Sequence, residues 1–135
     1  MTPSFAVFPS AKVLWTAHTV SGLAVLFLAF DATMKVLRLP AALEGTSRLG
    51  YPTGAILGLG LLQIACLILY LVRRTAVLGA ILWTGYLGGA VATHLRVGDP
   101  LFSHTLFPVY VGALLWLGLW LRAQRLRSLL PIAKS

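Results

Sequence analysis

The charged and histidine side chains that could bind a ligand gather at the expected ends of long apolar segments. They are Asp31, Lys35, His94, Arg96, Asp99 and His104. An ionisable group close to a membrane core is costly unless it is paired or hydrated, so such groups are candidates for function. The cluster predicts one of two arrangements: a network of salt bridges that ties helix ends together, or a site for the polar head of an amphipathic ligand.

His94 and His104 could also hold a metal or a haem, because we expect them at the same depth on consecutive helices, with Asp99 between them. A zinc site would need a third and a fourth donor, and only the two histidines support a haem. His18 lies thirteen residues before Asp31, about 20 Å along a helix, and cannot join the cluster. We therefore expect neither a metal nor a haem, and assign no catalytic residue.

Gln63 is the one strongly polar side chain near the middle of an apolar segment, on the same helix face as Gly60, Cys66 and Tyr70. It predicts either an interhelical hydrogen bond or a place in the lining of a cavity. Cys66 is the only cysteine, which excludes an internal disulfide and a CxxC redox motif. The candidate ligand-binding residues are therefore Asp31, Lys35, Gln63, His94, Arg96 and His104.

Four uncharged apolar segments must position these residues: 13–30, 53–72, 76–93 and 105–121. As helices, segments of this length match a hydrocarbon layer about 30 Å thick. Apolar residues make up 59% of the chain and charged residues only 10%, far below the quarter or so of a soluble domain. We predict an all-α fold: a single membrane domain over residues 1–135, forming an antiparallel bundle of four transmembrane helices at about 12–39, 53–72, 76–94 and 103–122.

The links between these segments carry turn and surface signals. The first helix is expected to run past the membrane core to about Leu39, where Pro40 ends it. Residues 41–49 then predict a short amphipathic segment on the outer interface. Arg73 and Arg74 form a tight hairpin, and Ser103 is expected to cap the last helix.

Small residues recur every four positions along the third helix, at Ala80, Thr84, Gly88 and Ala92. Rows of small residues let helix backbones approach closely in lipid. We expect this face to pack the bundle, so replacing Gly88 with leucine should break assembly.

The net charge of +8 is better explained by membrane orientation than by nucleic acid, because no basic surface with interleaved aromatic residues lies outside the apolar segments. If the four helices alternate in direction, one side carries only basic residues: Lys12, Arg73, Arg74, Arg122, Arg125, Arg127 and Lys134. The other side carries both signs: Lys35, Arg38, Arg48, Arg96, Asp31, Glu44 and Asp99. This asymmetry predicts cytoplasmic termini. The first segment is expected to be retained rather than cleaved, because it is longer than the apolar region of a usual signal peptide and no clean small-x-small cleavage site follows it.

Three motifs make the chain similar to a known family. They are Lys35 with Pro40, the turn Leu49-Gly50-Tyr51-Pro52, and the run from Gly85 to Arg96, GYLGGAVATHLR. On these motifs the chain resembles the DoxX-like family of small four-helix bacterial membrane proteins, over about residues 13–121. The resemblance implies a bundle in the bacterial inner membrane and, by analogy with relatives linked to quinone-coupled sulfur oxidation or oxidative-stress complexes, a quinone-facing accessory role.

The same resemblance bears on individual residues. His94 and Arg96 match the family run and are the residues most expected to contact a ligand. Related proteins often carry an acidic residue in the second helix, where this chain has Gln63. A role in proton handling is therefore not expected there.

Three functions agree with this sequence. The first is binding of a quinone-like or lipid-like molecule near the outer leaflet, or service as an accessory subunit of a membrane redox system. The second is a small oligomeric transporter or permeation subunit, although no helix is broken within its apolar segment. The third is a structural scaffold for a membrane enzyme. The expected partners are membrane lipids, with a second copy or a redox protein as further candidates, and quinone is the one cofactor that we expect.

Overall fold

Helices make up most of the part of the chain that the structure describes. This structure is a computed structural model, and it describes residues 9–129. Its elements are α1 (Ala11–Val36), α2 (Pro40–Arg48), α3 (Ala55–Leu71), α4 (Ala76–Arg96), the π-helical turn η1 (Leu101–Thr105), α5 (Phe107–Arg122) and α6 (Gln124–Leu129). Residues 9–129 contain no strand, which confirms the predicted all-α class.

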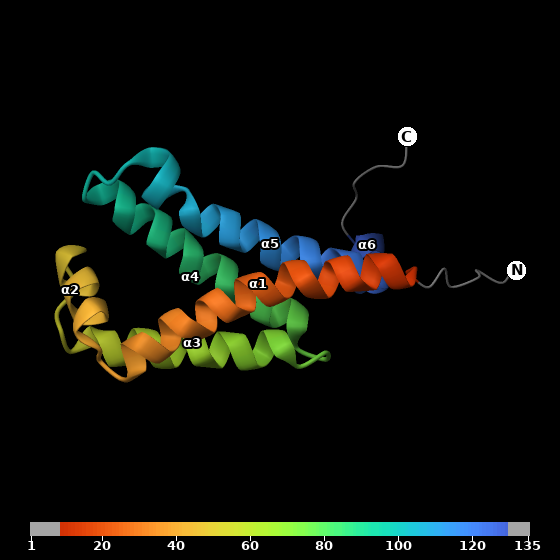
Figure 1. Cartoon of the computed structure of the whole chain (residues 1–135), viewed down its shortest axis with the longest axis horizontal. Coiled ribbons are helices and arrows are strands. Elements are labelled where there is room, and N and C mark those ends of the chain that lie inside the picture. The colour runs from red at the N-terminus through yellow and green to blue at the C-terminus, as the bar shows by residue number, and fades with distance from the viewer. Residues whose placement is uncertain (1–8, 130–135) are drawn as a thin grey trace, which may run out of the picture.

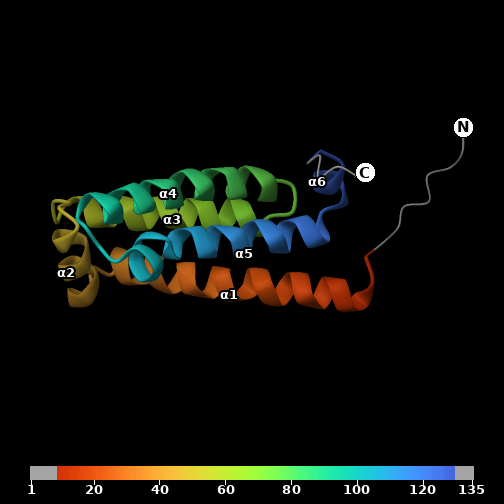
Figure 2. The ribbon, with the colours of Figure 1, turned by 90° about the horizontal axis from the view of Figure 1, so that it is seen from above.

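Helices α1, α3, α4 and α5 pack side by side, each against two of the others (Figures 1 and 2). Helix α1 contacts α3 and α5, and α4 contacts the same two. The short helix α2 lies across one end of this group, and α6 lies at the other end, where α1 begins. Buried apolar side chains from all four helices fill the interior, among them Leu28, Cys66, Trp83 and Leu115.

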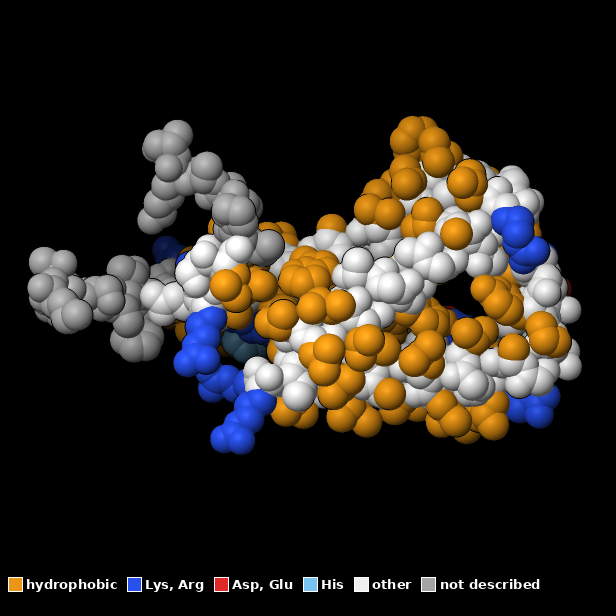
Figure 3. All heavy atoms as spheres, turned by 180° about the vertical axis from the view of Figure 1, so that it is seen from behind, with side chains coloured by type: hydrophobic (Ala, Val, Ile, Leu, Met, Phe, Trp, Pro, Cys, Tyr) orange, Lys and Arg blue, Asp and Glu red, His pale blue; other side chains and the backbone are white. Residues whose placement is uncertain are grey.

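The outer surface of these helices is strongly apolar. By length and composition, α1, α4 and the stretch Leu101–Arg122 could each cross a membrane, and α3 is a shorter apolar helix of 17 residues. Between 22% and 33% of each long apolar window is buried, so most of these side chains point outward. Figure 3 shows hydrophobic side chains along the length of one face and lysine and arginine side chains toward its two ends. This surface suits lipid rather than water.

The structure ends the first helix earlier than predicted. Helix α1 stops at Val36 rather than at about residue 39, because Arg38 takes a left-handed conformation with φ of 53°. Leu39 is then extended, as a residue before proline prefers to be, and Pro40 begins α2 at a first-turn position that suits it. The short segment predicted at residues 41–49 is helical from Pro40 to Arg48, as α2.

The last long helix also begins elsewhere. We expected it at residue 103 with Ser103 as its cap, but α5 begins at Phe107. Ser103 lies within η1, where its hydroxyl contacts Nδ1 of His104 at 2.8 Å. Pro108 occupies the first turn of α5, where no backbone N–H is needed. The prediction for Ser103 was wrong because the serine bonds to its neighbour instead of to the helix.

The close contacts between helices lie at glycines outside the predicted row. A Cβ atom on Gly88 would have no heavy atom within 4 Å, whereas one on Gly79 would lie 2.6 Å from Cα of Tyr70 in α3. A Cβ atom on Gly118 would lie 3.0 Å from the backbone oxygen of Ala17 in α1. Within this chain, therefore, Gly88 is exposed and makes no close contact between helices, whereas in the same row Ala80 is buried in the core and Thr84 accepts a hydrogen bond from Nε1 of Trp116 in α5 at 2.7 Å.

Candidate ligand-binding site

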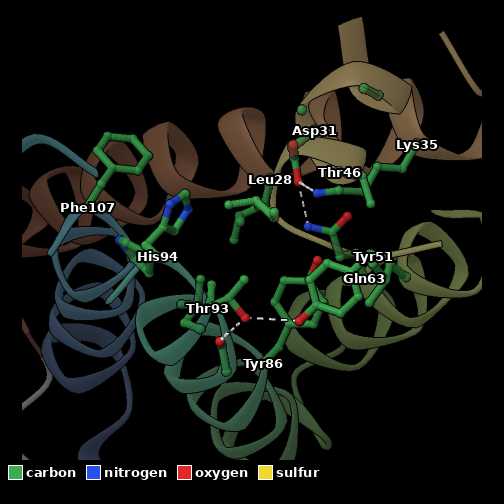
Figure 4. A pocket seen from close by; sticks show the side chains of 18 of the residues that line it. Leu28, Asp31, Lys35, Thr46, Tyr51, Gln63, Tyr86, Thr93, His94 and Phe107 are labelled. Carbon is green, nitrogen blue, oxygen red and sulfur yellow. Dashed lines mark hydrogen bonds and ion pairs between the residues drawn. The ribbon is translucent and has the colours of Figure 1, made fainter. Parts of the chain in front are cut away.

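A cavity of about 530 Å³ lies between the helices at the end that α2 covers. All five helices from α1 to α5 contribute to its lining. In the space-filling view a hollow opens toward this same end, opposite α6 (Figure 3). Figure 4 shows many of the side chains that line the cavity.

One part of the lining is apolar. Leu28 from α1, Leu87 from α4 and Val111 from α5 are buried and line the cavity. Phe27 and Phe107 join α1 to α5 through an edge-to-face contact with ring centroids 5.1 Å apart, a preferred arrangement of aromatic pairs. These walls can hold the hydrocarbon part of a ligand.

A first polar group joins α1 to α3 in the lining. Asp31 and Lys35 are one helical turn apart and form an ion pair on one face of α1, the pairing that a four-residue spacing on a helix favours. Gln63 of α3 donates from Nε2 to Oδ2 of Asp31 at 2.7 Å. Figure 4 shows the lysine and the glutamine both turned toward the carboxylate. The interhelical hydrogen bond that the sequence predicted for Gln63 is therefore present.

A second polar group joins the turn after α2 to α4. The hydroxyls of Tyr51 and Thr93 are 2.9 Å apart, and Thr93 donates its own proton to the backbone oxygen of Gly89 at 2.8 Å (Figure 4). Because a threonine hydroxyl has one hydrogen, Tyr51 must be the donor in the contact between the two side chains. This bond holds the segment between α2 and α3 against α4.

A third polar group fastens the end of α2. Arg48 donates two hydrogen bonds to Asp99, at 3.1 and 3.3 Å, and Asp99 also lies 2.6 Å from Nδ1 of His94. The carboxylate can only accept, so Nδ1 of His94 carries the proton of this bond. The hydrogen bond from His94, together with Arg48, holds the pKa of Asp99 below its ordinary value of 3.8, against the opposing effect of partial burial.

The lowered pKa of Asp99 predicts an acid-sensitive contact. A carboxyl with a lower pKa in the folded state stabilises that state above its ordinary value of 3.8 and loses this contribution as the pH falls through the lower folded value. We expect the melting temperature of the detergent-purified protein to fall below about pH 4. The Asp99→Asn variant should melt lower at neutral pH and show a smaller fall in acid. Parallel melting curves for the two proteins across this range would contradict the assignment.

The structure brings four of the six candidate residues to the cavity: Asp31, Lys35, Gln63 and His94 all line it. Arg96 is exposed and donates to the backbone oxygen of Leu49 at 2.7 Å, so it fixes the turn after α2 instead. His104 is exposed in η1, with its ring centroid 6.3 Å from that of His94, and is not part of the lining. Among residues 9–129, no three histidine, cysteine or acidic side chains converge as a metal site would require.

Other lining residues were not among the candidates. Tyr51 entered only as part of the turn Leu49-Gly50-Tyr51-Pro52, and Arg48 only in the charge count. Thr93 belonged to the GYLGGAVATHLR run, and its position next to His94 was the one signal that could have pointed to it. The pairing of Tyr51 with Thr93 spans 42 residues, and no local pattern reveals such a contact.

Comparison with known proteins gives one family match. The sequence model of the DoxX-like family matches residues 19–118, which include α2 to α4, most of α1 and much of α5. The chain belongs to the DoxX-like family. No curated protein and no solved structure matches the chain significantly. Membership of the DoxX-like family and the long apolar helices together make this a multi-pass membrane protein.

The DoxX-like match also covers the whole lining of the cavity. Every lining residue of the site, from Phe27 to Val111, falls within the matched region. The cavity is therefore built from the part of the chain that defines it as DoxX-like, and not from the terminal segments.

Proposed function

We propose that this protein binds an amphipathic, quinone-like or lipid-like molecule in the cavity beneath α2. The observation that carries the proposal is the shape and composition of that cavity: about 530 Å³, with apolar walls and a few polar groups gathered on α1, α3 and α4. Small-molecule sites usually enclose about 300–1,000 Å³ and combine apolar walls with a few well-placed polar groups. The apolar part of the ligand lies against Leu28, Leu87 and Val111, and its head lies near Asp31, Gln63 and His94.

The charges around the cavity favour a neutral head. Lys35 is neutralised by Asp31, and Arg48 is neutralised by Asp99. A charged head would meet no uncompensated opposite charge among these four residues, and burying an unpaired charge is costly. Quinones, quinols and neutral lipids satisfy this condition.

The proposed setting is a bundle of four transmembrane helices in the bacterial inner membrane, with both termini in the cytoplasm. Helix α3, at 17 residues, spans about 25 Å, a shortfall that local thinning of the bilayer accommodates. The end with α6 carries Lys12, Arg73, Arg74 and Arg122 and no acidic residue, which supports its cytoplasmic placement. Lys134, counted on that side, lies outside the described residues. In this orientation the cavity belongs to the outer leaflet.

A binding role of this kind suits an accessory subunit of a membrane redox system. The ligand would enter from lipid, because an apolar molecule dissolves there, and the protein would hold it near the outer surface for a partner enzyme. Surrounding lipids, a second copy of the chain and a redox enzyme remain the proposed partners, and quinone the proposed cofactor.

A matched pair of leucine substitutions tests this function. Gly85 lines the cavity and Gly88 does not, yet a Cβ atom on either has no heavy atom within 4 Å. The Gly85→Leu side chain should fill part of the cavity, whereas the Gly88→Leu side chain should point outside it. We expect Gly85→Leu to weaken binding of 2-decyl-1,4-benzoquinone at least about tenfold, or roughly 1.4 kcal/mol, and Gly88→Leu to leave it unchanged.

Equilibrium dialysis of the three purified proteins in one detergent measures this difference, and mass spectrometry of their organic extracts shows which lipophilic molecules each retains. Partition of the probe into detergent is the same for both variants and cancels in the comparison. Equal binding and equal retention by the wild type and Gly85→Leu, with both proteins folded by circular dichroism, would refute the proposal.

A further inference from the structure

At the polar end of the cavity, two hydrogen-bond acceptors have no partner among the described residues: Oδ1 of Asp31 and Oε1 of Gln63. Both hydrogen bonds that the structure gives to the Asp31 carboxylate end on Oδ2, so neither occupies Oδ1. Oε1 of Gln63 is buried and has no hydrogen-bond partner in the described structure. Gln63 itself is only 1% exposed, so water does not readily satisfy this oxygen. A buried acceptor without a partner is costly and marks a place where a donor belongs.

The orientation of the Gln63 amide follows from its neighbour. Asp31 is paired with Lys35 and therefore ionised, so it can only accept hydrogen bonds. The NH₂ group of Gln63 must face it, which leaves the amide oxygen as the free end. Turning the amide over would set two acceptors against each other. The ion pair between Asp31 and Lys35 therefore determines that the group of Gln63 left without a partner is its oxygen, an acceptor.

The carboxylate of Asp31 and the amide oxygen of Gln63 differ in how easily a ligand in the cavity reaches them. The side chain of Asp31 is 36% exposed, so a ligand in the cavity meets its carboxylate first. The Gln63 oxygen is covered, but the last side-chain torsion of glutamine is soft, and a small turn brings the oxygen toward a donor. Lys35 contributes an ammonium beside them, with three donors of which one serves Asp31.

We propose that the cavity selects a neutral head that bears a hydroxyl group, a hydroquinone or a long-chain alcohol, over one that only accepts hydrogen bonds. This inference rests on the proposed function. The hydroxyl donates its one hydrogen to Oδ1 of Asp31 or, alternatively, to Oε1 of Gln63, and its oxygen receives a hydrogen bond from Lys35. A quinone carbonyl or an ether can use the lysine but leaves both acceptors unpaired. A hydrogen bond to an ionised carboxylate is stronger than one between neutral groups, so we expect a large preference for the hydroxyl-bearing head.

Matched probes isolate the hydroxyl. The first set is 2-decyl-hydroquinone, its dimethyl ether and 2-decyl-1,4-benzoquinone, measured by equilibrium dialysis under anaerobic conditions. The second set is 1-dodecanol and its methyl ether. We expect the hydroquinone to bind the wild type at least about tenfold more tightly than its ether and its quinone. In Gln63→Met, which keeps the length of the side chain but loses the amide oxygen, this ratio should fall several-fold.

The outcomes separate this inference from the proposed function. A hydroxyl preference in only one probe set identifies its source as the aromatic or the aliphatic alcohol. Equal affinity within both sets, with binding still weakened by Gly85→Leu, would overturn the hydroxyl preference and leave the binding function standing. No binding of any probe to the wild type, with nothing retained in its organic extract, would overturn both. A ratio that Gln63→Met leaves unchanged would remove Gln63 from the proposal.

Discussion

Replacing Gly79 with alanine is expected to destabilise the protein more than any other single added methyl group in α4. A Cβ atom there would lie 2.6 Å from Cα of Tyr70 and closer still to its backbone nitrogen. Backbone atoms cannot move aside as the end of a flexible side chain can, so α3 and α4 must separate. The cost should reach the upper end of the roughly 1–3 kcal/mol typical of overpacked interiors, or exceed it.

Separating α3 from α4 at Tyr70 costs additional stability, because Tyr70 also makes hydrogen bonds to α1 and α5. Its hydroxyl donates to the backbone oxygen of Leu115 in α5 at 2.6 Å and lies 3.1 Å from the hydroxyl of Ser21 in α1. The guanidinium of Arg122 lies over the tyrosine ring, 5.1 Å from its centroid. A shift of α3 at Tyr70 therefore disturbs contacts with both α1 and α5.

Gly88→Ala is the matched control for Gly79→Ala. It adds the same methyl group to the same helix, where that group would meet nothing within 4 Å, and alanine favours helix over glycine. Thermal unfolding in detergent, followed by circular dichroism, should show a large fall in melting temperature for Gly79→Ala and none for Gly88→Ala. Equal melting temperatures for the two variants would mean that α3 and α4 do not pack as described.

The sequence alone did not identify the glycines at which the helices make close contact. The sequence predicted the helices well, because runs of apolar residues bounded by proline, glycine and charge determine helix position with little help from the tertiary structure. It did not predict which face of α4 points inward. Gly79 falls outside the regular row of small residues, whereas Gly88, within it, faces outward. In an apolar helix the inner and outer faces have similar composition, so hydrophobic periodicity carries little information.

The candidate site was predictable to a similar degree. The pairing of Asp31 with Lys35 is local to one helical turn and follows from spacing. Gln63 was identified because a polar side chain in an apolar helix needs a partner, but its partner Asp31 is 32 residues away and emerged only from the fold. Arg96 shows the opposite case: it shares the GYLGGAVATHLR run with His94, yet side chains two residues apart on a helix point to different sides, and Arg96 reaches the turn at Leu49 instead of the cavity.

Removing the Asp31 carboxylate is the substitution with the largest expected effect on the site. Asp31→Leu would leave the ammonium of Lys35, whose side chain is 15% exposed, without its partner, and would take from Gln63 the only acceptor that its amide has in the described structure. Breaking a buried ion pair from one side costs roughly 3–5 kcal/mol, and the partial exposure of Asp31 puts this variant toward the lower end. We expect a lower melting temperature and loss of the hydroxyl preference together.

A double-mutant cycle on Asp31 and Lys35 distinguishes a role of their ion pair in stability from a role of Asp31 in binding. Lys35→Met alone should cost less, because Asp31 keeps its bond to Gln63 and is 36% exposed. In the double variant Asp31→Leu/Lys35→Met no unpaired charge remains, so its melting temperature should rise above that of Asp31→Leu, as replacement of a buried ion pair by apolar residues often allows. Binding of 2-decyl-hydroquinone should not recover with it, because the carboxylate that accepts the hydroxyl is still missing.

A double variant that regains both stability and the hydroxyl preference would show that Asp31 is only a structural partner of Lys35. One that is as unstable as the sum of the single variants would show that the two residues do not interact.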